Sequence, residues 1–148
     1  MQRLKRSDIP LGVKLHALLL TVFIDTVGFG IVLPLLPYFA EKFGATPLVV
    51  TLLATVYSFT QFIFAPIWGK LSDRFGRRPI ILLTLAGMII GYALLAFSGS
   101  LLLLFFARAF TGAMAANGGV VHAYVADITN SSERAGGMGK LGAAHGLG

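Results

Sequence analysis

Cysteine is absent from this chain of 148 residues. It therefore has no disulfide, no cysteine-ligated metal site and no thiol nucleophile. Charge is scarce as well, since Asp, Glu, Lys and Arg make up 12% of the residues, where a soluble domain has about 25%. Apolar residues make up 56%, and the mean hydropathy is +0.82. This composition indicates a chain that has the lipid bilayer as its solvent.

Four apolar runs have about the ~20 residues that a helix needs to cross ~30 Å of hydrocarbon. Each must be helical, because lipid offers the backbone no hydrogen-bond partners. We therefore predict an all-α transmembrane fold in which short connections make neighbouring helices antiparallel. The predicted spans cover approximately residues 14–37, 48–69, 79–97 and 101–124, and the predicted cytoplasmic loops cover residues 69–79 and 125–136.

A fifth apolar run covers residues 137–148. A helix of this length reaches only roughly 18 Å at 1.5 Å per residue, so it cannot span a bilayer. We expect it to be part of a fifth helix, and the chain to be a fragment of a longer protein.

Positive charge collects on one side of the predicted membrane. Of the twelve Lys and Arg residues, Arg108 lies inside a span and Lys42 lies on the opposite side. The other ten share one side: Arg3, Lys5, Arg6, Lys14, Lys70, Arg74, Arg77, Arg78, Arg134 and Lys140. Because cytoplasmic loops carry the excess of Lys and Arg, we predict a cytoplasmic N-terminus. The net charge of +6 is thus a topology signal, and we expect no nucleic-acid partner.

The stretch Gly69–Pro79, GKLSDRFGRRP, places five charged residues between two apolar runs. Arg77 and Arg78 stand at the predicted start of a helix, where positive charge opposes the helix dipole. Lipid phosphate, Asp73, or a carboxylate of the next cytoplasmic loop such as Asp127 could hold them. Charge alone leaves two interpretations open: a latch on the cytoplasmic side, and a topology signal that contacts phosphate.

Two charged residues lie inside predicted spans. Asp25 lies roughly 16 Å from the cytoplasmic end of the first span, and Arg108 lies roughly 10 Å from the outer end of the fourth. A carboxylate at this depth usually faces a bundle interior or a cavity, and a buried arginine requires a partner because it cannot deprotonate. Asp25 is the only intramembrane carboxylate, so we predict that the two form a charge pair used in proton coupling. The alternatives are a structural role for Asp25 at a local helix break, and snorkelling of Arg108 to the outer interface.

Three further polar or aromatic residues lie at depth: Tyr57, Gln61 and Asn117. They are candidates for the lining of a substrate cavity, with interhelical contact as the alternative. His16 and His145 have no metal-ligand spacing with any other residue. We therefore expect neither a metal site nor enzymatic activity.

Small residues four positions apart recur in three predicted helices: Gly87 with Gly91, Gly112 with Ala116, and Gly142 with Gly146. This spacing lets helix backbones approach closely in lipid. Glycine is also common in membrane helices for no packing reason, so the sequence leaves both interpretations open at each place.

The Gly69–Pro79 stretch resembles the signature between the second and third helices of the major facilitator superfamily. That signature is a glycine, any residue, a leucine, a small residue, an aspartate, an arginine, any residue, a glycine and two bases. The matching residues are Gly69, Leu71, Ser72, Asp73, Arg74, Gly76, Arg77 and Arg78.

Two further signatures of the superfamily are similar to stretches of this chain. Arg108 and Gly112 resemble the fourth-helix signature, with Thr111 where a glutamine is often found. The first-helix signature of an acid with a glycine and proline run is met by Asp25, Gly28, Gly30, Pro34 and Pro37. Together the three stretches are most similar to drug:proton antiporters of the tetracycline-resistance branch.

The resemblance implies helices one to four and part of helix five of a 12-helix bundle in the bacterial cytoplasmic membrane. It implies export of a small molecule, for which tetracycline is one candidate, with the proton gradient as energy source and no cofactor. It further implies that Asp73 docks on the C-terminal half of the transporter, which this chain lacks, and holds the outward-facing state. Arg77 and Asp127 would belong to the same charge relay.

Two other functions fit the sequence. The chain could be a self-contained four-helix membrane protein that acts as a homo-oligomer, or a fragment without transport activity. The unfinished fifth helix and the superfamily signatures favour the transporter.

Overall fold

The computed structural model describes residues 11–147, whose regular secondary structure consists of helices joined by short turns. The helices are α1 (Leu11–Lys42), α2 (Pro47–Phe75), α3 (Arg77–Ala96), α4 (Leu101–Ala115), α5 (Gly118–Ile128) and α6 (Arg134–Leu147). The all-α prediction is confirmed. The predicted cytoplasmic N-terminus, with Arg3, Lys5 and Arg6, lies outside the described residues.

Four helical segments among the described residues are long and apolar enough to cross a membrane: Leu18–Tyr38, Pro47–Phe75, Arg77–Ala96 and Leu101–Ile128. Many of their large apolar side chains point outward, with Phe62 79% and Leu102 81% exposed. Such a surface is unfavourable in water at about 25 cal/mol per Å² and suits contact with lipid chains. These segments correspond to the four predicted spans.

The chain divides into two compact units. The bundle unit is Ile31–Tyr124, and the terminal unit combines Met1–Gly30 with Val125–Gly148.

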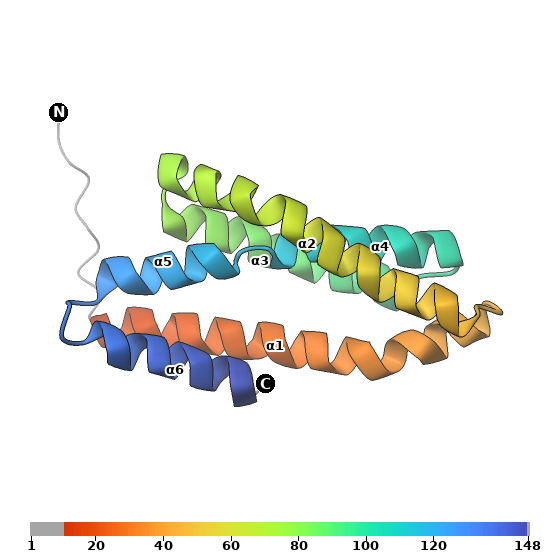
Figure 1. The fold of residues 1–148 in the computed structure, drawn as a ribbon, viewed down its shortest axis with the longest axis horizontal. Helices are drawn as coiled ribbons and strands as arrows, with labels where there is room; N and C mark the ends of the chain where they lie inside the picture. Colours follow the sequence, from red (N-terminus) through yellow and green to blue (C-terminus); the bar gives the residue numbers. More distant parts are fainter. Residues whose placement is uncertain (1–10, 148) are drawn as a thin grey trace. The chain divides into compact units, whose positions relative to one another are not determined.

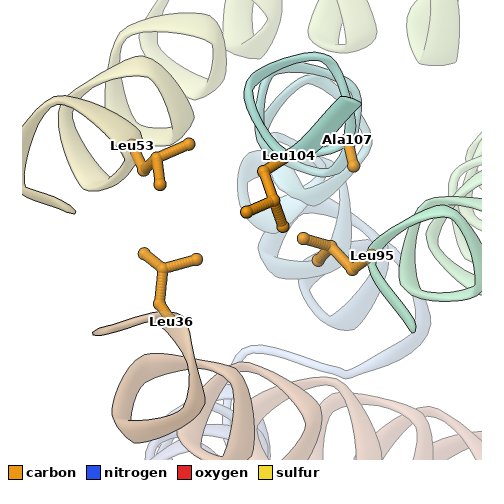
Figure 2. Packing of buried hydrophobic residues seen from close by; sticks show 5 residues of the cluster. All are labelled: Leu36, Leu53, Leu95, Leu104 and Ala107. Atoms are coloured by element: carbon orange, nitrogen blue, oxygen red, sulfur yellow. The ribbon is translucent and has the colours of Figure 1, made fainter. Parts of the chain in front are cut away.

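In the bundle unit, α2 and α3 both pack along α4 (Figure 1). Figure 2 shows the core of this unit, in which apolar side chains from four helices converge. These residues are Leu36, Leu53, Leu95, Leu104 and Ala107, each at most 7% exposed. Helix α4 supplies Leu104 and Ala107 to this core, and the next residue of α4, Arg108, is also buried.

Glycines bring the helices of the bundle unit close together. A Cβ atom on Gly112 would come within 3.0 Å of the backbone carbonyl of Tyr57, on α2. A Cβ on Gly91 would collide with Thr111, and one on Gly87 with the flexible side chain of Met114. The structure therefore shows close packing of neighbouring helices at these three glycines.

The connection between α2 and α3 consists of Gly76 alone, whereas the sequence predicted a loop over residues 69–79. Helix α2 continues through the charged stretch to Phe75, because none of those residues disfavours a helix strongly enough to end it. Gly76 has φ +100°, which side chains rarely allow, and its N–H donates to the Ser72 carbonyl at 3.0 Å. Gly69, by contrast, lies inside α2, where a Cβ atom would have open space around it to at least 4 Å.

The predicted span 101–124 is interrupted at Ala116 and Asn117, between α4 and α5. Gly118 and Gly119 follow the interruption, and glycine is a poor helix former. Side chains of α2 also donate hydrogen bonds to carbonyl groups near the end of α4, at Ala113 and Ala115.

The terminal unit contains the loop that joins α5 to α6. The Thr129 hydroxyl donates to the Val125 carbonyl at 2.7 Å, and Gly137 of α6 lies so close that a Cβ would stand 3.1 Å from the Thr129 methyl group. Arg134, the first residue of α6, donates to the Ala126 carbonyl at 3.2 Å. These contacts fix the start of α6 against the end of α5.

Candidate functional site

The junction of α2 and α3 is held by an ion pair and a hydrogen bond around Arg77. The Arg77 guanidinium lies 2.5 Å from the Asp73 carboxylate, and it donates to the Ser72 hydroxyl at 2.6 Å. The Ser72 hydroxyl in turn donates to the Gly69 carbonyl at 2.7 Å. The unfavourable positive charge at the start of α3 is thus offset by a carboxylate one turn earlier in the chain.

The other charged residues of the GKLSDRFGRRP stretch differ from Arg77 in their surroundings. Lys70, Arg74 and Arg78 lie at the surface, and the Arg74 guanidinium lies 5.4 Å from the ring centroid of Phe75. Leu71 is half-buried. The stretch therefore presents a basic surface around one neutralised pair.

Arg108 is the most deeply buried charged residue that the structure describes, with 1% of its surface exposed. Its guanidinium carbon lies 4.3 Å from the ring centroid of Tyr57, which is the distance of a cation–π contact. Its Nε has no hydrogen-bond partner among the described residues. The snorkelling alternative does not match this burial within the bundle unit.

Gln61 and Asn117, like Tyr57, make contacts inside the bundle unit. The Gln61 amide donates to the Ala115 carbonyl at 3.3 Å, and the Asn117 amide donates to the Thr84 hydroxyl at 2.7 Å. Each contact joins two helices or a helix to the interruption after α4. The role of these residues in a substrate cavity stays a prediction. The structure shows Gln61 and Asn117 in interhelical contacts.

Trp68 is a structural residue that the sequence motifs do not reveal. Its indole N–H donates to the Ala113 carbonyl at 2.6 Å, and together with Gln61 it bonds two carbonyl groups of the last turn of α4. A carbonyl next to a helix interruption loses backbone partners and needs others. The signal in the sequence is that the chain's single tryptophan lies inside a predicted span, where its N–H must find an acceptor.

Thr84→Val should destabilise the bundle unit by about 1–2 kcal/mol, because it leaves the buried Asn117 amide without its acceptor. Thr55→Val is the matched control, since the Thr55 hydroxyl is exposed and bonds only within its own helix. Thermal unfolding in detergent measures both. Equal shifts for the two variants would contradict the role of the Thr84–Asn117 contact.

Asp25 and Asp127 belong to the terminal unit. Asp25 lies in the interior of α1 and is half-buried, next to Thr26, whose hydroxyl bonds to the Val22 carbonyl at 2.9 Å. Asp127 is exposed near the end of α5. The pairing of Asp25 with Arg108, and the relay that joins Asp127 to Asp73, stay predictions because their members belong to different units.

Comparison with known proteins places this arrangement in a family. Residues 18–148 match the sequence profile of the Major Facilitator Superfamily. The chain belongs to the Major Facilitator Superfamily. It is 42% identical over 135 residues to the class B tetracycline resistance protein of Escherichia coli, covering 89% of this chain and 33% of that protein. It is 40% identical to the class C protein of Escherichia coli over 131 residues, covering 86% and 33%.

A third relative is the class D tetracycline resistance protein of Salmonella ordonez, with 40% identity over 135 residues, covering 89% of this chain and 34% of that protein. The chain thus spans about a third of the length of the curated superfamily members that it matches. The predicted relation to the tetracycline-resistance branch of the superfamily is confirmed at this level of similarity.

Proposed function

We propose that this chain forms the N-terminal part of a proton-driven exporter of small drug molecules in the bacterial cytoplasmic membrane. The similarity to three tetracycline resistance proteins supports export of a tetracycline-like substrate. The N-terminus would face the cytoplasm, and the proton gradient would supply the energy without a cofactor or an enzymatic reaction.

The observation that carries the proposal is the burial of Arg108 inside a helix bundle with an apolar core. A permanent positive charge in a membrane interior is expensive and marks an ion or substrate pathway. In the proposed cycle, Arg108 pairs with the Asp25 carboxylate when that group is ionised. Protonation of Asp25 removes the attraction and frees the two helices to move apart.

The Asp73–Arg77 pair would form this chain's part of a latch on the cytoplasmic side. Asp73 retains 65% of its side-chain exposure while paired with Arg77, so one face of the carboxylate is open to a further contact. We propose that the contact is made by the remaining part of the transporter, with Arg77 and Asp127 in the same charge relay. Closure of this contact would favour the outward-facing state.

Uptake into inverted membrane vesicles tests the proposed function directly. An imposed proton gradient should drive tetracycline accumulation in vesicles that contain the full-length transporter, and a protonophore should abolish it. Accumulation that persists after the gradient has collapsed would contradict proton coupling.

Asp73→Asn should slow export and leave the half-saturating substrate concentration nearly unchanged. The variant keeps the shape of the side chain but loses the charge that attracts Arg77. A largely exposed ion pair contributes only about 0–1 kcal/mol to stability, so slower export would reflect the conformational step and not unfolding. The measurement is the initial export rate against substrate concentration.

Glu41→Gln is the matched control for Asp73→Asn, because Glu41 is an exposed carboxylate of the same unit. It should export at the wild-type rate. An Asp73→Asn variant that loses only substrate affinity would overturn the latch.

A further inference from the structure

The bundle unit contains few carboxylates that could pair with Arg108. The unit contains two carboxylates, Glu41 and Asp73. Asp73 pairs with Arg77, and Glu41 is exposed at the end of α1. The guanidinium of Arg108 is nevertheless buried, and the structure gives its Nε no hydrogen-bond acceptor among the described residues.

An aromatic face takes the place of a carboxylate. The Tyr57 ring lies 4.3 Å from the guanidinium carbon of Arg108, and Tyr57 is itself 8% exposed. A ring face attracts a cation more strongly when both are removed from water, and the attraction then reaches about 2 kcal/mol or more.

The backbone sets the distance between ring and cation. Gly112 lies one helical turn after Arg108 on α4, and it stands against the carbonyl group of Tyr57 itself and the hydroxyl of Thr60. The absence of a side chain at Gly112 lets α4 lie directly on α2 at the residue that carries the ring. The contact is therefore built into the helix interface and does not depend on a flexible side chain finding its partner.

We propose that Tyr57 is the positioning residue for Arg108: its ring holds the guanidinium in place during the part of the cycle when no carboxylate is paired with it. This role rests on the proposed function of Arg108 in proton coupling. It assigns Tyr57 to the charge pair and not to the substrate. A Tyr57→Phe variant keeps the ring face and removes the phenol oxygen, so it separates the contribution of the ring from that of the hydroxyl.

A double-mutant cycle tests the contact without reference to transport. The full-length transporter and its Tyr57→Leu, Arg108→Met and doubly substituted variants are unfolded in detergent. We expect Tyr57→Leu to lower the folded-to-unfolded ratio about 10- to 30-fold more when Arg108 is present than when it is replaced by Met. Tyr57→Phe keeps the ring, so its effect should be the same in both backgrounds. Additive effects of the two substitutions would overturn the proposal.

Export then tests the positioning role. Tyr57→Leu should lower the maximal export rate about tenfold, and Tyr57→Phe should restore the wild-type rate, with half-saturating concentrations within about twofold of wild type in both. A raised half-saturating concentration with no loss of maximal rate would overturn the proposal in favour of a substrate contact. If the wild-type protein exports no tetracycline when a proton gradient is imposed, the proposed function fails. The double-mutant cycle still decides whether the Tyr57 ring holds Arg108.

Discussion

Asp25→Asn should abolish proton-driven export and leave the chain in the membrane. Asparagine has nearly the same shape as aspartate but cannot exchange a proton, so the proposed cycle loses the step that releases Arg108. Burying a neutral amide in a membrane helix is also less costly than burying a carboxylate, and insertion should not suffer. Export into inverted vesicles measures the first effect, and the amount of protein in the membrane fraction measures the second.

Thr26→Val is the matched control for Asp25→Asn. Thr26 is the next residue on α1, and its hydroxyl bonds within the helix to the Val22 carbonyl. Removing this hydroxyl takes a polar group from the same turn without affecting a titratable one. Export should stay near the wild-type rate. Wild-type export by the Asp25→Asn variant would eliminate Asp25 from the coupling mechanism.

Gly112→Ala should have the largest effect on stability of any single methyl group added to the bundle unit. The added Cβ would meet the backbone carbonyl of Tyr57 and the Thr60 hydroxyl, each at less than 3.0 Å. A backbone atom can move away only if α2 and α4 separate, and that separation also loosens the core at Leu53 and Leu104. Overpacking usually costs about 1–3 kcal/mol, and we expect about 3 kcal/mol here.

Gly119→Ala is the control, because no atom lies within 4 Å of its Cβ position. Its effect should stay below about 1 kcal/mol, and alanine's better helix propensity favours stabilisation. Two further variants, Gly91→Ala and Gly87→Ala, should have stability costs between these two. Gly91→Ala should cost more than Gly87→Ala, since the branched side chain of Thr111 yields less readily than Met114. Unfolding in detergent would rank the four, and a neutral Gly112→Ala would refute the close approach of α2 and α4.

The sequence allowed the helical class and the four spans to be predicted because length and hydropathy are properties of each segment alone. Arg108 could be recognised as a buried charge for the same reason. Its contact with Tyr57 could not, because the two residues lie far apart in the chain and nothing local specifies which faces of α2 and α4 meet. The glycine spacing did point to close packing. It could not distinguish Gly112, which packs against the backbone of α2, from Gly142, where a Cβ atom would meet no atom of a neighbouring segment within 4 Å.

Two differences from the predicted fold have local causes that a hydropathy pattern does not contain. The charged stretch after Gly69 was expected to be a loop because it is polar, but polarity alone does not end a helix, and α2 continues to Phe75. The interruption at Ala116 and Asn117 precedes two glycines, and Trp68 and Gln61 of another helix donate to the Ala113 and Ala115 carbonyl groups just before it.

The single-residue connection at Gly76 has a mechanical consequence. Two extended residues span at most about 7 Å, so the end of α2 and the start of α3 cannot separate without unwinding one of them. Arg77 adds an ion pair to Asp73 and a hydrogen bond to Ser72 across this connection. A displacement of the end of α2 must therefore carry the start of α3 with it, whatever the angle between the two helices.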